Sequence, residues 1–121
     1  MREDTLKLLL SDLNGRSTDI EGSALVSKDG LIIASYLSPG MAPDRVSTLV
    51  AALHALGDLV STTLHRGAAE HILISGKQGY VLINQTGDDA ILCLIGNKSV
   101  DLGLLSLEAS RAPSPATASL Q

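Results

Sequence analysis

The chain has 121 residues, enough for one ordinary domain, and its 45% hydrophobic and 18% charged residues are typical of a globular protein. It contains no Phe or Trp and only two Tyr, so the core is expected to be aliphatic, which disfavours an aromatic-lined ligand pocket and base stacking. A net charge of −4 with scattered basic residues argues against nucleic-acid binding, because phosphate contacts need clustered Lys and Arg.

Cysteine content and the N-terminal segment indicate the compartment. The single Cys93 excludes an internal disulfide and suits a reducing cytosol. The first residues, MREDTLK, place acids where a signal peptide needs a positive stretch followed by an apolar one. No apolar run approaches the ~20 residues of a membrane span. We therefore expect a cytoplasmic, soluble protein without a membrane span.

The first half of the chain predicts helix, hairpin and helix. Residues 3–14 carry leucines at helical spacing and end at a stop signal. Residues 22–35 form two apolar runs joined by Asp29-Gly30, which predicts a β-hairpin with a primed turn and a positive φ at both central residues. A long helix is expected over residues 44–66, because Pro and Asp stand at its start and Gly follows its end.

The second half predicts three strands and a terminal helix. HILIS (71–75), YVLIN (80–84) and AILCLI (90–95) are separated by short Gly-rich turns and should form an antiparallel meander. Residues 99–111 are expected to form a helix with Ser99 as its N-cap. The residues predicted to face inward are Leu102, Leu105 and Ala109.

The order of these elements, αββαβββα, defines an α+β fold. A five-stranded antiparallel sheet needs cover on at least one face, and the helix over 44–66 is the only one long enough to cross it. The two terminal helices are expected to flank it. We expect residues 1–111 to be one domain and residues 112–121, APSPATASLQ, to be a flexible C-terminal tail.

No residue pattern in the chain predicts a metal site or cofactor. His54 and His65 share a side of one helix but are separated by eleven residues, roughly 16 Å, which is too far for two ligands of one metal. His71 opens a strand with no cluster of Cys or acids beside it in sequence. Histidines on a solvated face are the favoured interpretation.

Catalytic groups are equally scarce. Cys93 lies in the most apolar strand, where a buried thiol has a raised pKa and is a poor nucleophile. Asp88 and Asp89 stand at a hairpin tip, where Asp serves turn geometry. The stretch 76–79, GKQG, lacks the spacing of a phosphate loop and is followed by another strand. We predict that the protein is not an enzyme.

The long helix carries more apolar surface than one sheet requires. On a helical wheel, a stripe centred on Leu49 is wide enough to cover the sheet, and Val50 and Leu59 extend it to nearly half of the circumference, against a usual arc of somewhat over 100°. Either a partner or the two terminal helices cover these shoulders, and we favour a partner. The expected stripe over the sheet comprises Val46, Leu49, Leu53, Leu56, Val60 and Leu64.

The strand over 71–75 indicates the same partner surface. It is apolar, without Pro or charge in its interior, and would be a liability if it lay unpaired at a sheet edge. Pairing with its copy in a second chain would extend the sheet and bring two long helices together in a C₂ homodimer. The residues predicted at this interface are Val50, Ala51, Ala52, Ala55, Leu59, Thr62, His71, Leu73 and Ser75.

Over about residues 3–111 the chain resembles the Roadblock family, named for the dynein light chain and including the bacterial gliding-motility GTPase regulator. The similarity rests on GSALVSKDGLIIAS, on VSTLVAALHALGDLV, and on HILISGKQGYVLINQTGDDAILCLIGNKSVDLGLL, in that order. The resemblance implies the αββαβββα fold and dimers formed by helix 44–66 and strand 71–75.

The resemblance also implies a function, namely regulation or scaffolding of small Ras-like GTPases on the paired helices, with no catalytic residue to transfer. Two other functions stay open at this point. One is a dimerisation adaptor in another cytoplasmic signalling complex. The other is a small-molecule sensor with a pocket between the long helix and the sheet, which the scarcity of aromatic residues disfavours.

Overall fold

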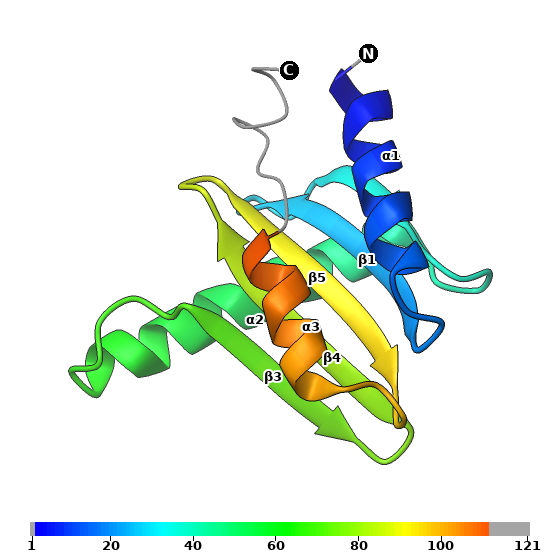
Figure 1. Cartoon of the computed structure of the whole chain (residues 1–121). Coiled ribbons are helices and arrows are strands. Elements are labelled where there is room, and N and C mark those ends of the chain that lie inside the picture. Colours follow the sequence, from blue (N-terminus) through cyan, green and yellow to red (C-terminus); the bar gives the residue numbers. More distant parts are fainter. Residues whose placement is uncertain (1, 112–121) are drawn as a thin grey trace.

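The computed structural model describes residues 2–111, which form eight elements in the predicted order (Figure 1). The predicted tail at 112–121 lies outside the described residues. The αββαβββα arrangement and the antiparallel meander are confirmed. The elements are α1 (Arg2–Gly15), β1 (Ile20–Ser27), β2 (Ile32–Tyr36), α2 (Pro43–Thr63), β3 (His71–Gly76), β4 (Gly79–Thr86), β5 (Ala90–Asn97) and α3 (Leu102–Arg111).

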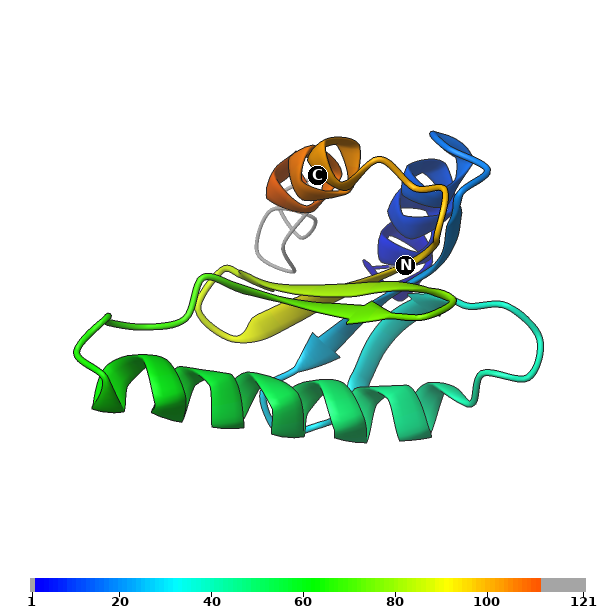
Figure 2. The ribbon, with the colours of Figure 1, turned by 90° about the horizontal axis from the view of Figure 1, so that it is seen from below.

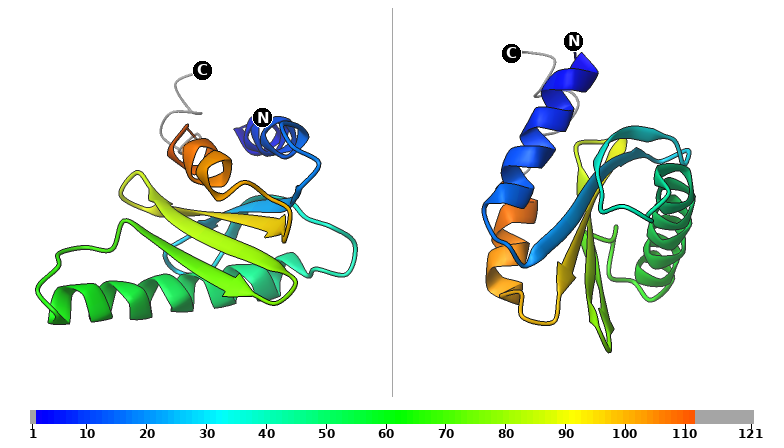
Figure 3. Two further views of the ribbon diagram at one scale, coloured as in Figure 1. Left: turned by 60° about the horizontal axis from the view of Figure 1, so that its bottom comes forward. Right: turned by 90° about the vertical axis from the view of Figure 1, so that its right-hand side faces the viewer.

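The five strands form one antiparallel sheet in the order β2-β1-β5-β4-β3. Helix α2 crosses one face, whereas α1 and α3 both pack on the opposite face (Figures 2 and 3). The chain therefore has three layers, with β2 and β3 at the two open edges of the sheet.

Strand β5 lies at the centre of the sheet and explains how the core divides. Its side chains alternate between the two faces, as the pleat of a strand requires. Leu92 and Leu94 point into the cluster under α1 and α3, and Ile91 and Cys93 point into the cluster under α2. Both faces are buried, which is why the strand reads as an unbroken apolar run.

The β1–β2 hairpin is confirmed, but the predicted primed turn is wrong. Only Gly30 has a positive φ, 89°, so Asp29 does not share the left-handed conformation. The N–H of Gly30 donates to the carbonyl of Ser27 at 3.0 Å, and the N–H of Ser27 donates to the carbonyl of Leu31 at 2.8 Å. This is a three-residue turn closed by a bulge, which uses one left-handed glycine where a primed turn uses two such residues.

Helix α2 ends earlier than predicted. Its last helical residue is Thr63 rather than Arg66, and His65 adopts a left-handed φ of 60°. The carboxylate of Asp58 accepts a hydrogen bond from the N–H of Ala69 at 2.9 Å. This bond ties the connection that follows the helix back to its last turns.

Helix α3 begins three residues later than predicted. Asp101 is its N-cap, because its carboxylate accepts the N–H groups two and three residues on, at 2.8 and 3.2 Å. Ser99 is therefore not the cap. Leu105 and Ala109 are buried as predicted, but Leu102 is exposed, since it stands at the first helical position beside the cap.

We predict that Gly79→Ala lowers the free energy of unfolding by about 1–3 kcal/mol, as overpacking of a close contact does. A Cβ at this position would collide with the carbonyl oxygen of Gly96 and lie 3.4 Å from Cα of Asn97, both of which are backbone and have little room to move. Urea titration measures the loss. Gly76→Ala in the same hairpin is the control, because its Cβ meets only one backbone oxygen at 3.4 Å. Equal stability losses in the two variants would contradict the steric explanation.

A candidate interaction surface on α2 and β3

The face of α2 that packs on the sheet is not the predicted one. Its buried residues are Ser47, Val50 and His54. Leu49, the centre of the predicted stripe, is 60% exposed. The prediction that the leucine-rich stripe covers the sheet is therefore wrong, and the helix is rotated by roughly 110° from it on the wheel. The members of that stripe that still pack partly against the core are Val46 and Leu53.

Small side chains explain this rotation. A Cβ at Gly57 would collide with the Cδ1 atom at the end of the Ile72 side chain, so glycine leaves room for Ile72 to pack against the helix in this conformation. The hydroxyl of Ser47 is buried at little cost, because it donates to the carbonyl of Asp44 at 2.9 Å. Close approach of this face creates dispersion contacts that larger residues would prevent.

The rotation leaves a row of large apolar side chains uncovered. The members of this row, the outer stripe, are each between 51% and 62% exposed. Helices α1 and α3 cannot cover them, since they lie on the other face of the sheet (Figure 2). The alternative that the terminal helices shield the shoulders of α2 is thereby excluded. The outer stripe consists of Leu49, Leu56, Leu59, Val60 and Leu64.

Strand β3 is an open edge beside α2. Its only neighbour in the sheet is β4, and five of its six residues are exposed. Leu73 and Ile74 are each 44% exposed, which is unusual for large apolar residues in a strand. Ile72 is half-buried because it packs under α2.

The hydrogen-bond pattern decides which β3 groups face outward. Strands β3 and β4 are joined by a turn of two residues, Lys77 and Gln78. At the other end of the ladder, the N–H of Gln85 donates to the carbonyl of Glu70 at 3.4 Å. Bonded and non-bonded pairs alternate along an antiparallel ladder. Consequently the main-chain N–H and C=O groups of three residues point away from β4, toward the open edge. These residues are His71, Leu73 and Ser75.

An apolar pocket of about 230 Å³ connects the two features. It lies between α2 and the sheet, where the small-molecule sensor hypothesis places a pocket. Leu49 belongs to both the pocket and the outer stripe, and Ile74 belongs to both the pocket and β3. Stripe, pocket and strand thus form one continuous surface. The pocket is lined by Val46, Leu49, Val50, Leu53, Ile74, Val81, Ile83, Cys93 and Ile95.

The predicted interface residues fall into two groups. Ala52, Ala55, Leu59, Thr62, His71, Leu73 and Ser75 are exposed on this surface. Val50, by contrast, is buried in the protein's own core, and Ala51 is half-buried with its Cβ near Gly30. The rotation of α2 turns both residues toward the sheet, so their side chains pack within the chain itself.

Sequence reasoning missed the residues that dominate the surface. The helical wheel assigns most of the outer stripe to the protein's own core, and Ile74 is absent from the predicted interface. The signal that identifies them is the row of small or polar residues Ser47, His54 and Gly57, which marks the side of closest approach to the sheet.

The described residues offer little for chemistry. Within residues 2–111 no three His, Cys, Asp or Glu side chains gather where they could hold a metal ion. The prediction that the histidines lie on a solvated face is wrong for His54, which is buried on the side of α2 that faces the sheet, whereas His65 and His71 are exposed. Burial raises the pKa of the Cys93 thiol to about 12, so the thiolate nucleophile is not available at neutral pH.

By length and composition, α2 is also the one helix in the described part of the chain that could cross a membrane, with a mean hydropathy of 1.2. Only 17% of the most apolar stretch of this helix is buried within the chain. Its hydropathy reflects apolar residues on both the inner face and the outer stripe.

Fold and surface together define a small α+β module with an exposed apolar stripe on α2 beside the open edge of β3. Comparison with known families gives the same class. The Roadblock/LC7 domain family matches residues 6–96, and the chain belongs to that family. Roadblock domains are in general regulatory rather than enzymatic.

Two archaeal relatives from Methanocaldococcus jannaschii support the assignment. The uncharacterized protein MJ0714 is 30% identical over 112 residues, covering 93% of each chain. The uncharacterized protein MJ0310 is 31% identical over 104 residues, covering 86% of this chain and 90% of the relative.

Solved structures share the fold. A Roadblock/LC7 domain from Streptomyces avermitilis superposes with a TM-score of 0.83 at 19% identity, covering 88% of this chain and 90% of that one. The gliding protein MglB from Thermus thermophilus also gives 0.83, at 17% identity, covering 99% and 93%. Profilin IB from Acanthamoeba castellanii is more distant, with 0.64 at 16% identity, covering 88% and 91%.

We predict that Cys93 is inert in the folded protein. Because burial raises its pKa to about 12, the thiol stays protonated at pH 8 and is also shielded from solvent. Iodoacetamide labelling followed by mass spectrometry should show no modification of the native chain and full modification in urea. Rapid labelling of the native chain at pH 8 would contradict the described packing of β5 under α2.

Proposed function

We propose that this chain is a homodimeric regulatory module that binds and modulates a small Ras-like GTPase in the cytoplasm. The observation that carries the proposal is the continuity of the outer stripe of α2 with the open edge of β3. An apolar surface of this kind, next to unpaired strand groups, is typical of an interface rather than of a solvated face.

The outer stripe provides the free energy for association. Its five side chains are each more than half exposed, and burying each would contribute about 1 kcal/mol or more. Small residues such as Ala52 and Ala55 lie on the exposed side of the same helix and permit a second helix to approach.

Strand β3 provides the register. Its outward main-chain groups lie at His71, Leu73 and Ser75, so a two-fold axis through Leu73 would place His71 of one copy opposite Ser75 of the other. In that arrangement the two sheets join into one, and the two α2 helices come side by side on the same face. The pairing would also protect the edge from uncontrolled aggregation.

The GTPase part of the proposal follows from family membership and from what the surface lacks. The chain belongs to the Roadblock/LC7 family, its fold is that of MglB, and the resemblance implies small GTPases as partners. Among residues 2–111 no metal-ligand cluster and no reactive thiolate is available. An effect on GTP hydrolysis would therefore arise from reshaping the partner's own active site.

The first test concerns the outer stripe. Leu59→Glu should raise the dimer dissociation constant by about 100-fold, because each copy then places an unpaired carboxylate in a desolvated contact. Sedimentation velocity over a concentration series measures this. Leu8→Glu is the matched control, since Leu8 is at least as exposed but lies on α1, on the opposite layer. A wild-type protein that stays monomeric at micromolar concentration would refute dimerisation.

The second test concerns the strand. Leu73→Pro removes a main-chain N–H that points to the open edge, so the chain should fold and lose dimerisation. In Ile74→Pro the lost N–H is one that bonds to Val81 in the same chain, so stability should fall first. Circular dichroism and sedimentation separate the two effects. Full dimerisation of a folded Leu73→Pro variant would exclude strand pairing at this edge.

The third test concerns the partner. Calorimetric titration with the small Ras-like GTPases of the same organism, each loaded with GDP and with a non-hydrolysable GTP analogue, should show binding to one of them that prefers one nucleotide. Leu59→Glu should weaken this binding together with the dimer. If none of them binds in either state, the GTPase is excluded, and a dimerisation adaptor for another signalling complex becomes the better account.

A further inference from the structure

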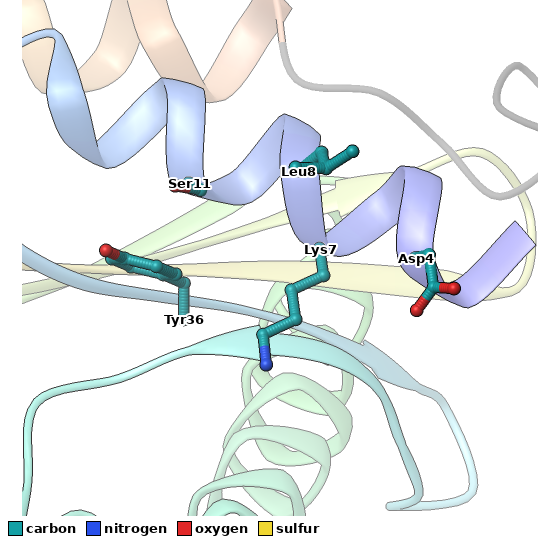
Figure 4. Close-up of a pocket in the computed structure, with 5 residues that line it drawn as sticks. All are labelled: Asp4, Lys7, Leu8, Ser11 and Tyr36. Atoms are coloured by element: carbon teal, nitrogen blue, oxygen red, sulfur yellow. The ribbon is translucent and has the colours of Figure 1, made fainter. Parts of the chain in front are cut away.

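The sheet has a second open edge, and a groove runs along it. Strand β2 is paired only with β1, and two hollows flank its outer side. The first has a volume of about 350 Å³ and lies between α1 and Tyr36 (Figure 4). The second, of about 380 Å³, lies over the segment 35–43. Both hollows include Lys7 and Tyr36, so we treat them as one feature, the β2 groove.

Apolar side chains form much of the β2 groove. Leu8 is 71% exposed, more than any other large apolar residue in the described chain, and Tyr36 is 45% exposed. Leu37 and Met41 line the far side. Because Leu8 and Tyr36 both line the first hollow, an aliphatic side chain could bury apolar surface there.

Lys7 gives the groove its charge. Asp4 also lines the first hollow, where Figure 4 shows Lys7 extending from α1 between Tyr36 and Asp4, but Lys7 is the only charged residue in the lining of the second. Among residues 4–110, whose side chains the structure describes, Lys7 takes part in no salt bridge and no side-chain hydrogen bond. An ammonium group beside apolar surface attracts a carboxylate more strongly than one in open solvent does.

The main chain of β2 supplies the third element. A strand with one neighbour presents unpaired N–H and C=O groups on its free side, and an added peptide strand can satisfy them. Helix α1 bounds the groove on one side and the segment 38–43 bounds it on the other. A single extended chain brings no helix of its own to these walls, whereas the edge of a second copy would bring its α1 along.

We propose that the β2 groove binds an extended segment of a partner protein, with an acidic residue paired to Lys7 and a neighbouring aliphatic residue over Leu8 and Tyr36. This surface lies at the opposite edge of the sheet from the α2–β3 surface, so it does not depend on the function proposed above. A dimer joined through β3 would present two such grooves at its two ends.

A displayed library of random decapeptides, selected on the wild-type chain, tests the proposal. Recovered peptides should carry a Glu or Asp beside aliphatic residues, and titration with the strongest of them should shift the amide resonances of residues 32–37. Lys7→Glu should lower the affinity for that peptide by about tenfold or more, as loss of a partly desolvated charge pair does. Lys28→Glu, the same charge change at an exposed lysine on the β1–β2 turn, should leave its affinity unchanged.

Three results would overturn the proposal. One is that no peptide is recovered, and another is that the recovered peptides bind wild type and Lys7→Glu equally. The third is assembly beyond the dimer that Lys7→Glu abolishes, which would place a second copy of this chain in the groove. Because Lys7 is exposed, the variant is expected to fold, and its thermal unfolding checks this.

Discussion

The close approach of α2 to the sheet is the contact on which the other features depend. It buries Ser47, Val50 and His54 and places Gly57 beside Ile72, so the helix rests on a side without its most exposed leucines. Ile72 fills the space that a side chain at Gly57 would occupy. Once this side faces inward, the large leucines must face outward, because a helix cannot bury opposite sides against one sheet.

The placement of α1 and α3 on the other face has a second consequence. These helices cover the leucine-rich side of the sheet, including Leu92 and Leu94, and leave α2 alone on its own face. Within the part of the chain that the structure describes, neither the outer stripe nor the main-chain edge of β3 is covered by another element. The domain thus has a packed core but leaves large apolar side chains exposed on α2 and β3, which suits a module that acts by assembly.

Most of the fold could be predicted from the sequence because its signals are local. Leucine spacing in α1, Asp-Gly and Gly-rich turns, and the apolar runs of β4 and β5 each act over a few residues. The errors fell at the ends of helices and in one turn, where several neighbouring residues can serve as a cap or turn residue. Asp101 caps α3 in place of Ser99, and the connection held by Asp58 ends α2 before Arg66. The turn at Gly30 is a three-residue turn with a bulge, and the Asp29-Gly30 pair by itself does not distinguish this form from a primed turn.

For the candidate surface, the sequence by itself determined that α2 carries more apolar residues than one contact can bury, and that the strand from His71 is unprotected as an edge. Only the tertiary structure decided which side of α2 is spare, and hence that Val50 is core whereas Leu49 and Leu56 are surface. The reason is steric. The apolar arc covers nearly half of this helix, so hydrophobicity alone does not fix its rotation, and the distance of closest approach to the sheet does.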